Sequence, residues 1–175
     1  MANSKKFVYD KDTGYAELKT RFSGGKAWHV VVGHLQSSGV YRKKTKDAGK
    51  RKKRGEGEQG ITMAQIAAIH EFGTIDGRIP ARSFMGSSID DNRDRITRLL
   101  SKLANGVLDK KYSEAGALAR LGTFVVDLFR GKIRSKIPPP LKAATIKRKG
   151  AGKTTPLVDT GQLIGSISYE VRKGK

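Results

Sequence analysis

The sequence predicts an α+β fold in which a small antiparallel or mixed sheet packs against two long helices, with a long basic loop inserted. Three observations support this prediction. Residues 27–35 are apolar on both faces of a strand, two later segments repeat apolar side chains at three- and four-residue steps, and residues 166–171 alternate apolar and polar side chains. Residues 1–175 are expected to form one domain, with residues 36–60 as the flexible loop and residues 138–156 as a Pro/Lys-rich connector.

The first sixty residues contain one clear strand. Tyr15, Leu18 and Phe22 fall at helical spacing and suggest a short helix before two glycines. Residues 27–35 follow, and because both of their faces are apolar they are expected to form a central strand that is covered on each side. Residues 36–60 contain almost no apolar side chains. Burying so few apolar side chains could not offset the entropy cost of ordering the segment, so a flexible loop is predicted.

A short helix is expected to begin after Thr62. Thr62 and Gln65 have the spacing of a capping box, in which each side chain satisfies a free backbone N–H of the first turn. Gly73 is expected to end this helix in a left-handed conformation. The apolar side chains of this helix are expected to form one stripe, consisting of Met63, Ile66, Ile69 and Phe72.

Two longer helices are predicted next. The first spans residues 89–107, about six turns, with acidic residues near its start where the helix dipole favours them. The second begins at Ser113 and has an inner stripe of Leu118, Leu121, Val125 and Leu128. Three prolines at 138–140 are expected to end it in a polyproline-like spacer, followed by a short basic helix over residues 141–149.

The C-terminal segment joins a one-turn helix to a strand. Asp159 and Gln162 have capping spacing, and Ile167, Tyr169 and Val171 alternate with polar residues. A half-buried strand of this kind needs a partner, which we expect to be residues 27–35.

No residue pattern predicts catalysis, a metal site or a cofactor. His29 and His34 are five residues apart on a strand and therefore point to opposite faces. His70-Glu71 lacks the second histidine of a zinc-protease motif, because that position is Thr74. Gly152-Lys153-Thr154 lacks the earlier glycine of a phosphate-binding loop, because Lys147 stands there. The chain has no cysteine. The protein is therefore expected not to be an enzyme.

Charge is the strongest compositional signal. Lys and Arg number 36 against 16 Asp and Glu, a formal net charge of +20, which favours polyanions or acidic protein surfaces as partners. Either genomic DNA or an acidic protein could contact the basic loop, and the residues expected to do so are Arg42, Lys43, Lys44, Lys46, Lys50, Arg51, Lys52, Lys53 and Arg54.

No apolar run has the roughly 20 residues of a membrane span and no secretory signal begins the chain, so we expect synthesis in the cytoplasm and no membrane partner.

Two segments, residues 71–84 and residues 157–171, are expected to form interfaces. An extended Pro-Ala-Arg-Ser-Phe segment combines arginine and an aromatic side chain, types that are enriched at interaction hot spots. The residues predicted to contact other subunits or partners are Phe72, Gly73, Pro80, Arg82, Phe84, Asp159, Thr160, Gly161 and Tyr169.

The order of these segments resembles that of the tail-completion, or virion-morphogenesis, proteins of long-tailed bacteriophages, which lie at the head-tail junction. The resemblance covers residues 61–171: residues 66–74 leading to 79–84, residues 138–150, and residues 157–171 ending in a strand. Ser83 stands where the family commonly has a second proline. Residues 36–60 and the extreme N-terminus lie outside the resemblance.

The resemblance implies a structural virion protein, assembled in the host cytoplasm, that forms a ring of six copies and completes or terminates the tail. Its implied partners are further copies of itself, a tail tube or tail terminator protein, a head connector or adaptor protein, and genomic DNA in the lumen. The alternative, which the charge favours, is a basic nucleic-acid-binding module that is not part of a virion ring.

Overall fold

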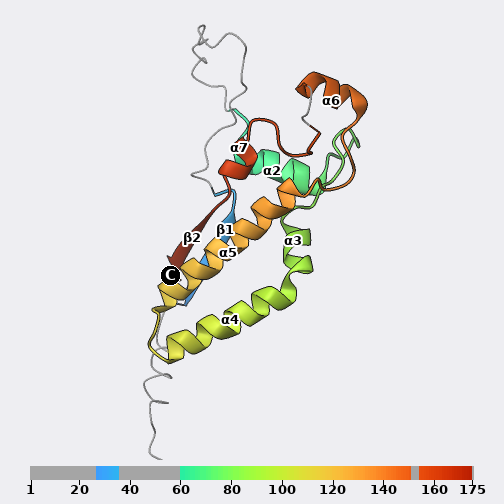
Figure 1. Ribbon diagram of the computed structural model, residues 1–175. Helices are drawn as coiled ribbons and strands as arrows, with labels where there is room; N and C mark the ends of the chain where they lie inside the picture. The colour runs from blue at the N-terminus through green and yellow to red at the C-terminus, as the bar shows by residue number, and fades with distance from the viewer. Residues whose placement is uncertain (1–26, 36–59, 151–153, 175) are drawn as a thin grey trace, which may run out of the picture.

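The computed structural model describes residues 27–35, 60–150 and 154–174. Within them the fold is α+β: a two-stranded antiparallel sheet packs against helix α5 (Glu114–Arg134), and α5 also contacts helix α4 (Arg93–Leu108). Figure 1 shows α5 running alongside both strands. The shorter helices gather toward one end of the molecule and are α2 (Met63–Phe72), α6 (Ala143–Lys149) and α7 (Gln162–Gly165). The predicted helix near residues 15–22 lies outside the described residues, as does the predicted basic loop at residues 36–60 except for its last residue.

The predicted pairing of the two strands is confirmed. Strand β1 (Trp28–Gly33) pairs with strand β2 (Ser168–Lys173), so that Trp28 lies opposite Lys173 and Gly33 opposite Ser168. Within the described residues β1 has this one neighbour and Trp28 is exposed, so the expected burial of both faces of β1 is not found there.

Helix α2 (Met63–Phe72) begins as predicted and buries a different stripe. The Thr62 hydroxyl accepts a hydrogen bond from the Gln65 amide, and the Gln65 side chain accepts one from the Thr62 amide, which completes the capping box. The predicted stripe is wrong at its last member, because the buried side chains are Met63, Ala67 and Glu71, four residues apart, and Phe72 points to solvent. Gly73 ends the helix with φ +77°, but its ψ of −177° is extended and not left-handed helical.

The predicted helix over residues 89–107 is two helices. Helix α3 (Gly86–Asp91) and helix α4 (Arg93–Leu108) are separated at Asn92, whose backbone has φ −120° and ψ 17°. The Asn92 side-chain amide donates to the Ser88 carbonyl at 2.9 Å, a local hydrogen bond of the kind that competes with the helical ladder. A second difference is that α3 begins three residues earlier than predicted.

Helix α5 (Glu114–Arg134) supplies more of the core than any other described element. The Ser113 hydroxyl caps its start by accepting from the Gly116 amide. Its buried face is broader than the predicted stripe and consists of Ala117, Leu121, Gly122, Val125, Val126, Phe129 and Ile133. Gly122 lies beneath the ring of Tyr169, where a Cβ atom would come within 2.6 Å of that ring, so the missing side chain lets β2 approach α5.

The C-terminal third includes two predictions that fail. The peptide bond between Pro138 and Pro139 is cis and the chain bends there, so the prolines do not form the expected polyproline-like spacer. Helix α6 (Ala143–Lys149) follows as predicted. Helix α7 (Gln162–Gly165) is preceded by Gly161 in a left-handed conformation, with no capping bond from Asp159. Thr160 takes that place, since its hydroxyl accepts from the Gln162 amide at 3.4 Å.

Candidate functional site

The first feature of the site is a buried carboxylate at the end of α2. Glu71 is only 7% exposed, and its two oxygens accept four hydrogen bonds. The donors are the Ser83 hydroxyl (2.6 Å) and the backbone amides of Phe84 (2.8 Å), Met85 (3.0 Å) and Gly86 (2.9 Å). The Gly86 amide is the first of α3, and the amides of Phe84 and Met85 immediately precede it. Helix starts leave N–H groups unpaired and favour negative charge, so Glu71 stabilises the backbone that leads into α3.

The hydrogen bonds to Glu71 determine its charge. Burial by itself raises the pKa of the Glu71 carboxyl, but the hydrogen bonds from Ser83, Met85, Gly86 and Phe84 together outweigh burial and lower that pKa below its ordinary value. The carboxylate is therefore ionised at neutral pH.

A buried arginine crosses from the same segment to the proline bend. Arg82 is 6% exposed, and its guanidinium donates to the Pro139 carbonyl at 2.9 Å and to the Pro140 carbonyl at 3.4 Å. Its own amide donates to the His70 carbonyl at 2.7 Å. Arg82 thus joins α2 to a loop that lies more than fifty residues later in the sequence.

Residues 73–79 form a turn that folds back on the end of α2. The Thr74 amide donates to the Ile79 carbonyl at 2.9 Å, and the Thr74 hydroxyl donates to Asp76 at 2.6 Å while accepting from the Ile79 amide at 3.0 Å. Gly73 lies so close to the returning chain that a Cβ atom there would come within 2.8 Å of the Ala81 amide nitrogen. A glycine is needed here both for this contact and for the positive φ.

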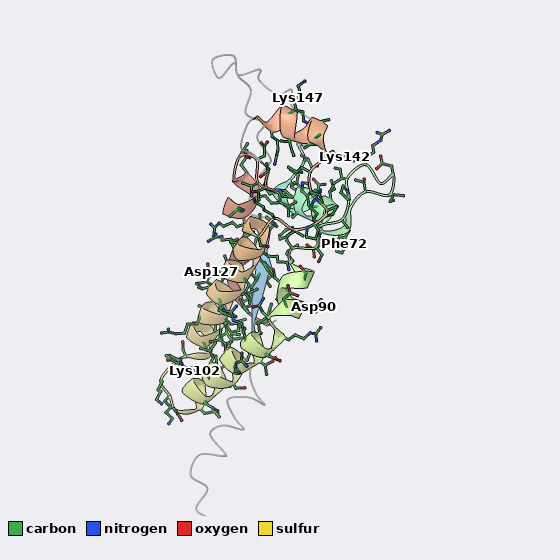
Figure 2. The ribbon with its side chains drawn as sticks, turned by 45° about the vertical axis from the view of Figure 1, so that its right-hand side comes forward. Phe72, Asp90, Lys102, Asp127, Lys142 and Lys147 are labelled. Atoms are coloured by element: carbon green, nitrogen blue, oxygen red, sulfur yellow. The ribbon has the colours of Figure 1, made fainter. Side chains whose placement is uncertain are left out.

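This turn presents two apolar side chains to solvent. Phe72 is 80% exposed and Ile75 is fully exposed, which makes them the most exposed large hydrophobic side chains of the described residues. Figure 2 shows Phe72 at the outer side of α2, pointing away from the helices. We call Phe72 and Ile75 the apolar tip. Glu71 and Arg82 fix the backbone on either side of the apolar tip, so the tip is held in one position.

The predicted interface residues of the first segment divide into exposed and buried ones. Phe72 is exposed as an interface residue requires, and Gly73 and Pro80 are half-buried. Phe84 is completely buried in the core of its own chain, and Arg82 bonds to its own proline bend, so neither side chain is available to a partner in this structure. Composition alone could not separate these two from Phe72, because the same residue types form cores and interfaces.

The second predicted segment lies at the surface near α7 and β2. Asp159, Gly161 and Tyr169 are exposed, and Thr160 is half-buried. The ring of Tyr169 packs over Gly122 of α5, so part of its surface already belongs to the chain's own core. The two predicted segments come together through α2 and α7, which are in contact.

The predicted DNA or acidic-partner contacts, Arg42 to Arg54, all lie outside the described residues. The described part of the chain has a further basic surface on α6, which composition predicted as a basic helix without assigning it a role. Lys142, Lys147 and Arg148 are exposed there, and Figure 2 shows Lys142 and Lys147 at the same end of the molecule. Lys149 instead donates to the carbonyls of Thr155 and Val158 and fixes α6 to the following loop.

Two histidines are half-buried near this site. The Nδ1 atom of His34 lies 2.8 Å from the Ser166 hydroxyl, and the His34 ring meets Phe84 edge-on at a centroid distance of 6.0 Å. Burial lowers the pKa of His34 to about 4. Burial also lowers the pKa of His70, helped by the positive charges of Arg82 and Lys149. Both rings are therefore neutral at pH 7.

We expect His34 to make the fold sensitive to acid. The unfolded chain binds a proton at His34 below about pH 6.5, whereas the folded chain resists doing so until about pH 4, so stability is lost as the pH falls through this interval. In thermal unfolding followed by circular dichroism, Tm should fall between pH 6.5 and pH 4, and His34→Asn should reduce that fall. His29→Asn, a change at an exposed strand position, is the control. Equal losses of Tm in all three proteins would contradict this role for His34.

Within the residues that the structure describes, no three His, Asp or Glu side chains lie close enough together to hold a metal ion. None of the described helices combines the length and the apolar character that crossing a bilayer requires. No family model, no curated protein and no solved structure matches this sequence.

Proposed function

We propose that this chain is a structural, non-catalytic subunit of the head-tail junction of a tailed bacteriophage. In this role it forms a ring of six copies that completes or terminates the tail and joins it to the head connector. The segment order described above supports the family assignment. The partners are other copies of the chain, the tail tube or tail terminator protein, and the head connector or adaptor protein.

One observation carries the proposal. The buried charged side chains Glu71 and Arg82 make their hydrogen bonds within the chain, to backbone groups and to the Ser83 hydroxyl, and together they hold the apolar tip exposed. Ionisable groups in an active site would be expected to face a cleft, with free valences for a substrate. Groups that instead fix a rigid loop with exposed aromatic and aliphatic side chains suit a subunit that docks on other proteins.

The experiment is to incubate the purified full-length protein with isolated phage tail tubes and examine the tubes by electron microscopy. We expect rings at one end of each tube, and a mass by light scattering that corresponds to a multiple of the subunit. A protein that leaves tubes uncapped, and is missing from purified virions by mass spectrometry, would contradict the proposal.

A basic nucleic-acid-binding module is the second candidate, and the exposed cations of α6 favour it together with the net charge of +20. It predicts DNA binding that weakens steeply with salt and that falls when Lys142, Lys147 and Arg148 are replaced by glutamine. Titrating the protein with DNA and with tail tubes at two salt concentrations separates the two candidates. Salt-sensitive DNA binding without capping of tubes would favour the module.

A further inference from the structure

The positive charge of the described residues is concentrated in one stretch of the chain. Residues 128–158 contain no Asp or Glu, and their described members include eight Lys and Arg side chains. The rest of the described chain is nearly neutral, with 11 Lys and Arg against 10 Asp and Glu. The stretch runs from the C-terminal end of α5 through the proline bend to α6 and the loop after it, and Figure 1 shows the end of α5 and α6 toward the same end of the molecule.

Three of these eight cations are engaged within the chain. Arg130 donates to the Ile167 carbonyl at 2.9 Å, Lys132 pairs with Asp91 at 2.6 Å, and Lys149 donates to two carbonyls after α6. The other five are exposed, and none of them has an ion-pair partner among the described residues. We call these five the basic surface, which consists of Arg134, Lys136, Lys142, Lys147 and Arg148.

The acidic residues at this end of the molecule do not neutralise the basic surface. Glu71 is buried, and its oxygens accept hydrogen bonds from the chain itself. Asp76 pairs with Arg78 at 3.2 Å. Asp159 is exposed and is the first acid after α6, but a single carboxylate leaves most of the five positive charges uncompensated.

Helix α6 is fixed to the body of the protein at both ends. Before the helix, Arg82 donates to the Pro139 carbonyl of the proline bend at 2.9 Å. At its last residue, Lys149 donates to the Val158 carbonyl at 2.7 Å. A helix whose position is already fixed loses less entropy when a partner binds than a mobile one does. The cations of α6 are therefore presented on a preformed element.

The composition of the basic surface fits a phosphate backbone better than a protein. No aromatic, Leu, Ile or Val side chain of the described residues 128–158 is exposed, whereas protein interfaces depend on central apolar or aromatic anchors. Contacts with phosphates need cations alone. Single-stranded nucleic acid is bound largely by stacking bases on aromatic side chains, and the basic surface offers none. The partner that these observations favour is a nucleic-acid duplex.

We propose that the basic surface binds the phosphate backbone of duplex DNA without preference for sequence. Phosphate contacts position a protein on DNA and carry no sequence information, because the bases are not touched. This inference goes beyond the proposed function, since a ring subunit and an independent module would both make the contact. It also differs from the contact expected of residues 42–54, because it assigns DNA binding to a surface that holds without them.

The first test compares two pairs of substitutions that lower the net charge equally. Lys147→Gln/Arg148→Gln changes the basic surface, and Arg98→Gln/Lys102→Gln changes exposed cations of α4. In fluorescence-anisotropy titrations with a duplex of mixed sequence, the α6 pair should weaken binding at least about tenfold at about 50 mM salt and lower the slope of log K against log salt by about 2. The α4 pair should bind almost as the wild type does. Circular dichroism checks that both variants are folded.

A second measurement separates the basic surface from residues 42–54. A chain in which the nine basic residues of that segment are replaced by glutamine should still bind the duplex. Adding Lys147→Gln/Arg148→Gln to this chain should weaken binding by a factor similar to that in the wild-type background. Complete loss of binding when residues 42–54 alone are neutralised would overturn the inference.

A third measurement leaves every charge in place. Because the chain has no cysteine, Ala144→Cys on α6 and Ser101→Cys on α4 can each carry one photo-crosslinker without a background reaction. Ala144 precedes Lys147 by three positions and Ser101 follows Arg98 by three, so each label lies beside cations of its own helix. Illumination with the duplex should link DNA to Ala144→Cys and leave Ser101→Cys unlinked.

The outcomes separate this inference from the proposed function. Equal losses of affinity in the two charge pairs, or equal crosslinking at the two positions, would overturn the assigned surface and leave the head-tail role untouched. DNA binding at the basic surface by a protein that leaves tail tubes uncapped would support this inference and contradict that role. If the α6 pair binds DNA as the wild type does but no longer caps tubes, the basic surface contacts an acidic protein and the DNA contact is wrong.

Discussion

Replacing Glu71 with glutamine is expected to lower the free energy of unfolding by about 3–5 kcal/mol. The carboxylate accepts hydrogen bonds from one hydroxyl and three backbone amides in a buried position. Glutamine has nearly the same shape, but it offers one acceptor oxygen and turns an NH₂ group toward the amides, so several buried donors lose their partner. Urea unfolding followed by circular dichroism measures the change.

The matched control is Glu170→Gln, the same substitution in an exposed ion pair with Arg172, which should leave stability nearly unchanged because solvent screens exposed pairs. The pH dependence gives a second readout. Because the folded-state pKa of Glu71 is lowered, its contribution is present above its ordinary pKa of 4.5 and is lost as the pH falls through the folded-state value. Glu71→Gln should therefore remove part of the acid sensitivity, and a variant as stable as the control would refute the anchoring role.

Phe84→Ala is expected to destabilise the subunit by about 3–5 kcal/mol, since its side chain is completely buried and truncation leaves a cavity. Phe72→Ala provides the matched comparison twelve residues earlier. Phe72 is 80% exposed, so the same substitution should change the stability of the dilute monomer by less than about 0.5 kcal/mol. Denaturant unfolding at low protein concentration measures both.

The two phenylalanines should also differ in assembly. Phe72→Ala should fold normally and weaken association, whereas any assembly defect of Phe84→Ala should follow from its loss of stability. If Phe72→Ala proved as destabilising as Phe84→Ala, the exposed position of the apolar tip would be wrong.

The features that the sequence predicted well depend on residues close together in the chain. The capping box of Thr62 and Gln65 joins residues three apart, and the start of α5 at Ser113 likewise depends on a residue three positions later. The alternation of β2 is visible within six residues, and its pairing with β1 followed because both strands needed a partner. Short-range side-chain chemistry of this kind is readable from sequence because helix and strand periods fix which neighbours meet.

The misplaced features depend on contacts between distant residues. Glu71 was assigned no role from sequence, because its partners come 12 to 15 residues later, where the N-cap residue Met85 provides no side-chain cap for α3. The break at Asn92 separates apolar residues whose spacing continues unchanged across it. A pattern of spacing cannot reveal a hydrogen bond that the chain forms only after it has folded back on itself.

The sequence by itself determined the α+β class, the helix α5, the capped start of α2 and the pairing of the two strands, because periodicity and capping depend on neighbouring residues. Only the tertiary structure decided which members of residues 71–84 face inward. It buried Phe84 and bound Arg82 to carbonyls 57 and 58 residues away, while it left Phe72 and Ile75 in solvent. The physical reason is that burial is a property of the whole chain's packing, to which residues far apart in sequence contribute together.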